Sequence, residues 1–190
     1  MVSGITIRKR PLLPRRKGKR ILHICVERDR TRVTALRDQV TALVEPTLAD
    51  TVHGWRKGHS PKTAAAHIRS EMDGRPLIVF DLRHFFESID QRRMKAHLDK
   101  LAPNLWLECV RWTPDSGLSQ GIAFTPALAN LYLSSFDARW NSAETTLIRY
   151  CDNFALIGGD FATLGNQLAQ IGLHYHTVEK APTQFCGITL

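Results

Sequence analysis

The hydrophobic and polar positions of this chain follow two different periods. Short apolar runs at residues 77–80 and 154–157 are typical of buried strands. Apolar residues three or four positions apart over residues 34–44 predict an amphipathic helix, which we expect to stop before Pro46. The same spacing, together with residues suited to start a helix, predicts further helices that begin near Ser60, Asp90, Thr125 and Asp160.

The order of these elements indicates the fold class. Helices dominate the first part of the chain, and a strand, helices, a β-hairpin, a helix and short strands follow. This order predicts an α+β fold in which helices back an antiparallel sheet. With 190 residues and 43% hydrophobic content, the chain is long enough for one domain or one compact pair of subdomains.

Positive charge is concentrated near the N-terminus. The formal net charge is +8, and residues 8–20 contain eight lysines and arginines and no acidic residue. Such a run favours a phosphate-rich partner, while a solvated or localising tail is the alternative for its first half. The second half leads into a strand-like pattern at residues 21–26, so we expect that part to belong to folded structure.

The cysteines indicate the compartment. They are scattered without the spacing of a zinc site or a disulfide framework, at Cys25, Cys109, Cys151 and Cys186. This usage predicts a reducing environment. The sequence also shows no signal peptide and no membrane-spanning segment, so we expect a cytoplasmic protein without a membrane partner.

Two aspartates stand where predicted strands end. Asp81 follows the apolar run at residues 77–80, and Asp152 lies at the polar tip of the predicted hairpin. If these strands pair, both carboxylates reach one point, and carboxylates paired in this way commonly hold magnesium. Taken singly, each aspartate also fits an ordinary strand end or turn.

Several segments in order carry a more specific pattern: residues 19–24, 53–60, 81–90, 117–121, 125–133, 149–154, 179–180 and 185–187. From about Arg15 to the C-terminus, they resemble the motifs of reverse transcriptases of the bacterial group II intron and retron kind. The sequence departs from the family's motifs at four positions: Trp55, His59, Ser119 in place of a proline, and Asn153 in place of a second aspartate.

The resemblance implies a right-hand polymerase fold made of fingers and palm. Residues 1–14 are then expected to form a basic N-terminal arm, residues 15–75 a fingers-like subdomain, and residues 76–190 a palm-like subdomain with the catalytic motifs. The family continues past residues 185–187 into a helical thumb. Because this sequence ends at Leu190, we expect it to lack that thumb domain. A thumb-supplying or oligomeric partner is one explanation, and a truncated gene product or a domain excised from a longer protein are the alternatives.

The resemblance also implies the chemistry. A reverse transcriptase extends a DNA or RNA primer on an RNA template with dNTPs, and two Mg²⁺ ions about 3.5 to 4 Å apart stabilise the attacking and leaving oxygens. Asp81, the backbone carbonyl of Leu82 and Asp152 are the expected metal ligands. Asn153 completes the catalytic set, but its amide lacks the charge of an aspartate, so we expect weaker metal binding, with Mn²⁺ as the alternative ion.

Five residues are expected, by the same resemblance, to bind the incoming nucleotide. Arg20 and Lys17 are expected to bind the triphosphate, and Phe86 to lie under the sugar, where it excludes a 2′-hydroxyl. Gln120 is expected to contact the nucleotide, and Lys180 to donate a proton to the leaving pyrophosphate. Phe85 and Phe86 are expected to be adjacent strand residues, of which only one can face the core, so a core aromatic is the plainer interpretation of Phe86. A solvated lysine is the plainer interpretation of Lys180.

Arg56, Lys57 and His59 form a second basic group, on a glycine-punctuated loop. They are expected to contact the backbone of the RNA template and to recognise its A-form geometry rather than its base sequence. His67, on the predicted alanine-rich helix, is interpreted as a packing residue.

Two other functions fit parts of the sequence. Asn153 and the expected lack of a thumb also suit a catalytically weakened protein that binds nucleic acid or acts as a scaffolding subunit. Residues 158–161 superficially resemble a nucleotide cyclase signature, but they follow the second hairpin strand and lack the signature's glutamate. Intron mobility, a retron, phage defence and a decayed element all fit the biological role.

Overall fold

The computed structural model describes residues 10–17 and 20–190. The described chain divides into two compact units, each built from two separate segments. The helical unit comprises the residues up to Pro46 together with Phe86–Ala129, and the sheet unit comprises Thr47–Phe85 together with Asn130–Leu190. The division into residues 15–75 and 76–190 concerns subdomain roles and stays a prediction.

The helical unit starts with two strands and a long helix. Strand β1 (Leu12–Lys17) pairs antiparallel with β2 (Arg20–Cys25), and a 3-10 turn, η1 (Glu27–Asp29), leads into helix α1 (Arg30–Val44). The predicted helix over residues 34–44 is therefore confirmed and begins one turn earlier. Its buried side chains recur at helical spacing: Val33, Leu36, Val40 and Val44. A second 3-10 turn, η2 (Glu45–Thr47), follows.

The second segment of the helical unit is built around α4 (Gln91–Leu101). The Asp90 side chain accepts hydrogen bonds from the backbone N–H groups of Arg92 and Arg93, which confirms the predicted start of this helix. Short elements that the pattern did not predict follow it, α5 (Leu105–Cys109) and η3 (Val110–Trp112). The Trp112 indole donates to Asp29 at 3.3 Å, which ties η3 to η1.

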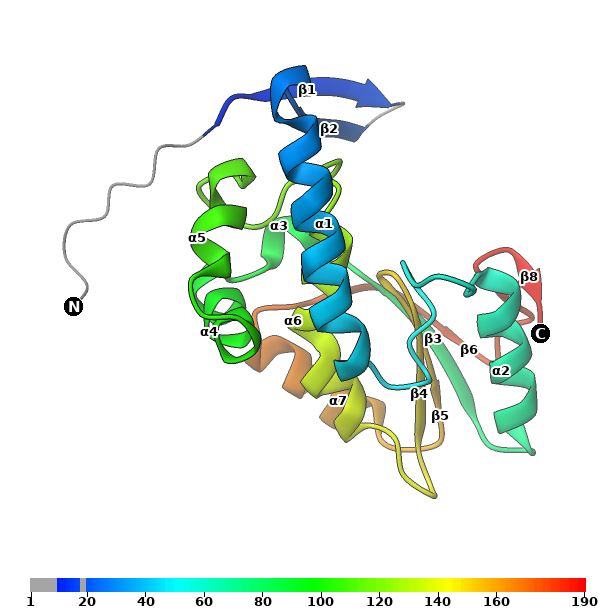
Figure 1. The fold of residues 1–190 in the computed structure, drawn as a ribbon. Coiled ribbons are helices and arrows are strands. Elements are labelled where there is room, and N and C mark those ends of the chain that lie inside the picture. The colour runs from blue at the N-terminus through cyan, green and yellow to red at the C-terminus, as the bar shows by residue number, and fades with distance from the viewer. Residues whose placement is uncertain (1–9, 18–19) are drawn as a thin grey trace. The chain divides into compact units, whose positions relative to one another are not determined.

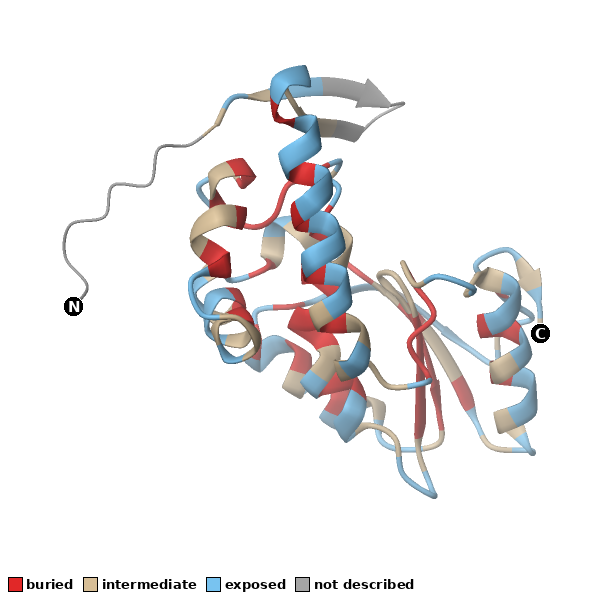
Figure 2. Cartoon of the chain, in the orientation of Figure 1, coloured by how far each residue is buried: buried red, intermediate tan, exposed pale blue. Residues whose placement is uncertain are grey.

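In the described part of the sheet unit, four strands form an antiparallel sheet in the order β4-β5-β3-β6 (Figure 1). The strands are β3 (Leu77–Leu82), β4 (Thr146–Tyr150), β5 (Asn153–Ile157) and β6 (Tyr175–Lys180). The predicted apolar strand and hairpin are confirmed as β3 and the pair β4-β5. Buried positions run along β4 and β5 in Figure 2.

Helices cover both faces of this sheet. Helix α2 (Pro61–Met72) begins at a Ser60 cap, as predicted, and packs with the strands β7 (Gln184–Phe185) and β8 (Ile188–Thr189) on the face that carries Leu77 and Ile148. The other face carries Phe80, whose ring stacks on Phe154 at 4.9 Å and meets Phe161 of α7 (Phe161–Gln170) edge-on. Helix α6 (Thr125–Arg139) contributes its second half to this face.

Two further findings concern the predictions. The strand that carries Asp81 ends at Leu82, and His84 has a left-handed φ of 48°, which turns the chain away from the sheet. Phe86 therefore lies in a short helix, α3 (Phe85–Ser88), rather than in the expected strand.

The chain passes from one unit to the other within α3 and within α6. Among the described residues, the structure contains no helix with both the length and the apolar character needed to cross a membrane.

Candidate active site

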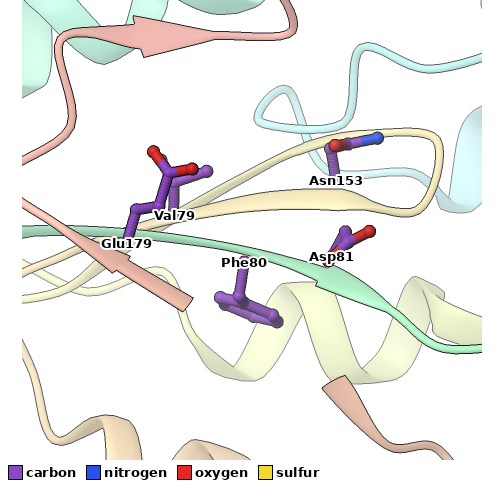
Figure 3. Close-up of a pocket in the computed structure, with 5 residues that line it drawn as sticks. All are labelled: Val79, Phe80, Asp81, Asn153 and Glu179. Carbon is purple, nitrogen blue, oxygen red and sulfur yellow. The ribbon is translucent and has the colours of Figure 1, made fainter. Parts of the chain in front are cut away.

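Strands β3 and β5 bring Asp81 and Asn153 directly opposite each other. Their register pairs Asp81 with Asn153, and side chains paired in this way share one face of the sheet. Both side chains are half-buried and line a cavity of about 230 Å³ together with Val79, Phe80 and Glu179 (Figure 3). The two strands thus deliver polar side chains to a common point.

Asp152 lies one residue before this pair, in the turn that joins β4 to β5. Its backbone carbonyl accepts a hydrogen bond from the Leu82 N–H at 3.0 Å, which fixes the turn against the end of β3. Its carboxylate accepts a hydrogen bond from the Asn153 amide at 3.2 Å. Burial, and then the neighbouring Asp152 charge, raise the pKa of the Cys151 thiol to about 12, so this thiol stays neutral beside the turn.

The cavity includes an acidic residue that the sequence did not single out. Glu179 lies opposite Val79 in the β3-β6 register, and Val79 and Asp81 are two residues apart on β3, so all three share a face. Lys180 pairs with Ile78 and lies on the opposite face of the sheet. The register therefore places the glutamate, rather than the lysine, on the face of the sheet that carries Asp81.

The donor atoms around the Asp81–Asn153 pair are oxygens, from two carboxylates and one amide, and such hard ligands suit Mg²⁺. Within residues 10–17 and 20–190, no group of three or more His, Cys, Asp or Glu side chains is arranged to hold a metal ion. The two carboxylates and the amide suit an ion that takes its remaining ligands from phosphate groups and water, as Mg²⁺ does in sites that bind nucleotides.

A family profile matches most of the chain. The profile described as "Reverse transcriptase (RNA-dependent DNA polymerase)" matches residues 7–171. The chain belongs to the reverse transcriptase family. No curated protein sequence matches the chain significantly.

Solved structures of telomerase share the fold of this chain. Apo telomerase from Candida tropicalis, truncated from the C-terminal domain, superposes with a TM-score of 0.61 at 12% identity over 95% of this chain and 51% of that chain. Telomerase from Candida albicans, in complex with the TWJ fragment of telomeric RNA, gives a TM-score of 0.64 at 14% identity over 94% of this chain and 42% of that chain. The chain thus spans about half the length of these proteins or less.

The predicted nucleotide-binding residues of the chain lie in both units. In the helical unit, the Phe86 carbonyl accepts a hydrogen bond from Leu118, and the Gln120 amide donates to Glu87 at 3.3 Å. These bonds hold the glycine-flanked loop at residues 117–121 against α3. Gly117 is required there, because a Cβ at this position would lie 2.7 Å from the Glu87 backbone.

Lys17 and Arg20 lie at the facing ends of β1 and β2, where they pair with each other in the register. Their side chains lie outside the described residues, as does most of the predicted basic arm, residues 1–9. The predicted triphosphate contacts of Lys17 and Arg20 and the arm's role therefore stay predictions.

The basic loop at residues 53–59 belongs to the sheet unit. The Arg56 guanidinium donates to the carbonyls of Ala49 and Val52, both at 2.9 Å, so it fixes the backbone that leads into the loop. Lys57 is exposed, and the His59 ring contacts the His53 ring at 3.2 Å. Of the three residues predicted to contact the template, Lys57 has the most accessible side chain.

Histidine rings fasten this loop to α2. The His53 ring contacts Thr63 through Nδ1 and His67 through Nε2, at 2.9 and 3.0 Å. Burial, with the neighbouring His67 and His59 rings, lowers the pKa of His53 to about 4, so His53 is neutral at pH 7. His67, which the sequence indicated as a packing residue, thus contacts the loop through its ring.

Proposed function

We propose that this protein is an RNA-directed DNA polymerase that extends a DNA or RNA primer on an RNA template by two-metal nucleotidyl transfer. The observation that carries the proposal is the β3-β5 register, which pairs Asp81 with Asn153 beside the Asp152 turn in a chain of the reverse transcriptase family. Two carboxylates held close together, one at a strand end and one in the neighbouring turn, are what a two-ion site needs from the protein.

In this proposal, Asp81 and Asp152 hold the two Mg²⁺ ions, and the Leu82 carbonyl adds a ligand. The bound ions stabilise the attacking and leaving oxygens of the transfer. Asn153 acts through its neighbour, because its amide N–H donates to the Asp152 carboxylate and so orients it. Mn²⁺ is the alternative ion, since it binds oxygen ligands of similar kind.

The remaining assignments follow the family motifs. Phe86 excludes ribonucleotides, Gln120 contacts the nucleotide, and Arg20 and Lys17 bind its phosphates. Lys57 is the template contact that the described structure supports best, because its side chain is exposed on the loop at residues 53–59. The fingers-like and palm-like roles of residues 15–75 and 76–190, and the group II intron or retron kind, belong to the same proposal.

Primer extension tests this function. The purified chain, a labelled DNA primer annealed to an RNA template, dNTPs and Mg²⁺ or Mn²⁺ are expected to produce a product ladder that requires the template and disappears with EDTA. Tight, salt-sensitive binding of the same RNA without any product in either metal would contradict the polymerase. It would instead support the second candidate, a nucleic-acid-binding or scaffolding subunit, which the uncharged Asn153 favours.

Asn153→Asp is expected to preserve or raise polymerase activity. The added carboxylate faces Asp81, so it should lower the Mg²⁺ concentration for half-maximal activity by up to about tenfold, equivalent to roughly 1.4 kcal/mol of added attraction. A Mg²⁺ titration of primer extension measures this effect, with Asn166→Asp, an exposed position on α7, as the matched control. A clear loss of activity would show that the turn depends on the amide N–H that Asn153 donates to Asp152.

A further inference from the structure

A charged side chain lies wholly inside the sheet unit next to the Asp152 turn. Arg149 on β4 and Asp137 on α6 both have exposed side-chain fractions of 0%. The Arg149 guanidinium donates to Asp137 through Nε at 3.1 Å and through Nη2 at 2.7 Å. Burial raises the pKa of the Asp137 carboxyl, and the Arg149 charge opposes that rise.

The other edge of the same guanidinium reaches the turn. Arg149 Nη1 donates to the Cys151 carbonyl at 3.1 Å and to the Asn130 side-chain oxygen at 2.9 Å. Cys151 directly precedes Asp152 and has a left-handed φ of 61°. A hydrogen bond to its carbonyl therefore fixes the peptide plane from which Asp152 extends.

Asn130 connects this turn to the basic loop. Its side-chain N–H group donates to the Gly54 carbonyl at 3.0 Å, while its oxygen accepts from Arg149. The loop also pairs with β4 through its backbone, because His53 donates to the Arg149 carbonyl at 2.7 Å and Arg149 donates to the Thr51 carbonyl at 2.9 Å. The loop, α6 and the turn thus share one hydrogen-bond network.

If position 149 were needed only for packing, an apolar residue would be sufficient there. Replacement of a buried ion pair by well-packed apolar residues is often neutral or stabilising, so stability is a weak explanation for the Arg149–Asp137 pair. A planar guanidinium, however, offers five donors in a fixed geometry and can bind a carboxylate along one edge and carbonyl oxygens along the other. The arrangement suits a residue that fixes the geometry of the turn.

We propose that Arg149 and Asn130 are positioning residues, which place Asp152 for metal binding and couple that placement to the loop at residues 53–59. This inference rests on the proposed polymerase function for its catalytic consequence. Its structural part, the joint restraint of turn and loop, does not depend on activity.

Two substitutions each remove a different part of this hydrogen-bond network. Arg149→Lys keeps a positive charge beside Asp137 but loses the second N–H edge, and Asn130→Ala removes the link between turn and loop. Gln167→Ala is the matched control, because Gln167 also takes part in a side-chain hydrogen bond within the sheet unit, from the Trp140 indole, without contacting Arg149, Asn130 or their hydrogen-bond partners. All four proteins are compared well below their midpoints of thermal unfolding.

Hydrogen exchange provides the readout that needs no polymerase activity. The Leu82, Arg149 and His53 backbone amides, whose hydrogen bonds hold the turn and the loop, are expected to exchange about tenfold faster in Arg149→Lys and Asn130→Ala, and at nearly the wild-type rate in Gln167→Ala. In primer extension, the two variants are expected to lower kcat by about tenfold to a hundredfold, with little change in KM for dNTP and a raised Mg²⁺ requirement.

The outcomes are distinct. Exchange at these amides that matches the control would overturn the inference, and so would faster exchange with an unchanged kcat. An inactive wild-type protein would refute the proposed function, while the exchange rates would still decide whether Arg149 and Asn130 restrain the turn and loop together.

Discussion

Asp81→Asn is expected to lower the rate of metal-dependent nucleotide incorporation by at least about a thousandfold. The substitution keeps the shape of the side chain but removes its charge, so that two amides, at positions 81 and 153, would face each other across β3 and β5. Loss of a carboxylate that is proposed to hold the metal ions would forfeit about 4 kcal/mol of transition-state stabilisation. Single-nucleotide incorporation under saturating dNTP measures the effect.

The same variant should fold and bind RNA normally, since the Asp81 side chain is only half-buried at the cavity rim. Asp73→Asn is the matched control: Asp73 is exposed after α2, and its left-handed φ of 34° is one that asparagine also tolerates. Near-normal incorporation by Asp81→Asn would remove Asp81 from the metal site and with it the two-metal assignment.

Gly54→Ala is expected to be the second most damaging change. A Cβ at Gly54 would lie 2.0 Å from the Cys151 backbone nitrogen and 2.7 Å from its Cα, so the loop or the turn must move. Both neighbouring atoms belong to the backbone and cannot rotate away. A displacement of about 1 Å at the turn would lower kcat by about a hundredfold. The measurements are kcat in primer extension and the midpoint of thermal unfolding.

Gly58→Ala separates this contact from ordinary glycine strain. Gly58 lies in the same loop with a φ of +81°, and a Cβ there would meet open space. This variant should lose about 1 kcal/mol of stability through backbone strain and keep nearly full activity. Equal effects of Gly54→Ala and Gly58→Ala would contradict the close contact between Gly54 and the Cys151 backbone.

Local signals were sufficient to predict most elements of the fold. Ser60, Asp90 and Asp160 cap helices as the sequence indicated, because capping depends on residues within one turn. The short helix α5 was not predicted, since five residues carry too little periodicity to be distinguished from a loop. Phe86 was expected in a strand, because the left-handed residue that follows β3 is His84, which the pattern does not mark as a stop.

The candidate site was predictable in its residues but less so in its geometry. Asp81 and Asp152 follow from strand ends and motif order, yet the register that pairs Asp81 with Asn153 depends on contacts between distant segments. Neighbouring residues of a strand face opposite sides of the sheet, so a shift of the register by one residue would exchange the side chains that face the cavity. In the observed register, Glu179 lines the cavity and Lys180 lies on the other face. The partners of Arg149 likewise come from another element and required the structure.

The pairing of β3 with β5 also determines when the site can form during synthesis. Asp81 is made about seventy residues before Asn153, and β6 is made later still. At synthesis rates of roughly 5–20 residues per second, β3 stays unpaired for several seconds until its partner strands have been made. Uncovered strand edges promote association between nascent chains. The yield of folded protein should therefore depend on the speed of translation and on chaperone supply as well as on the stability of the finished fold.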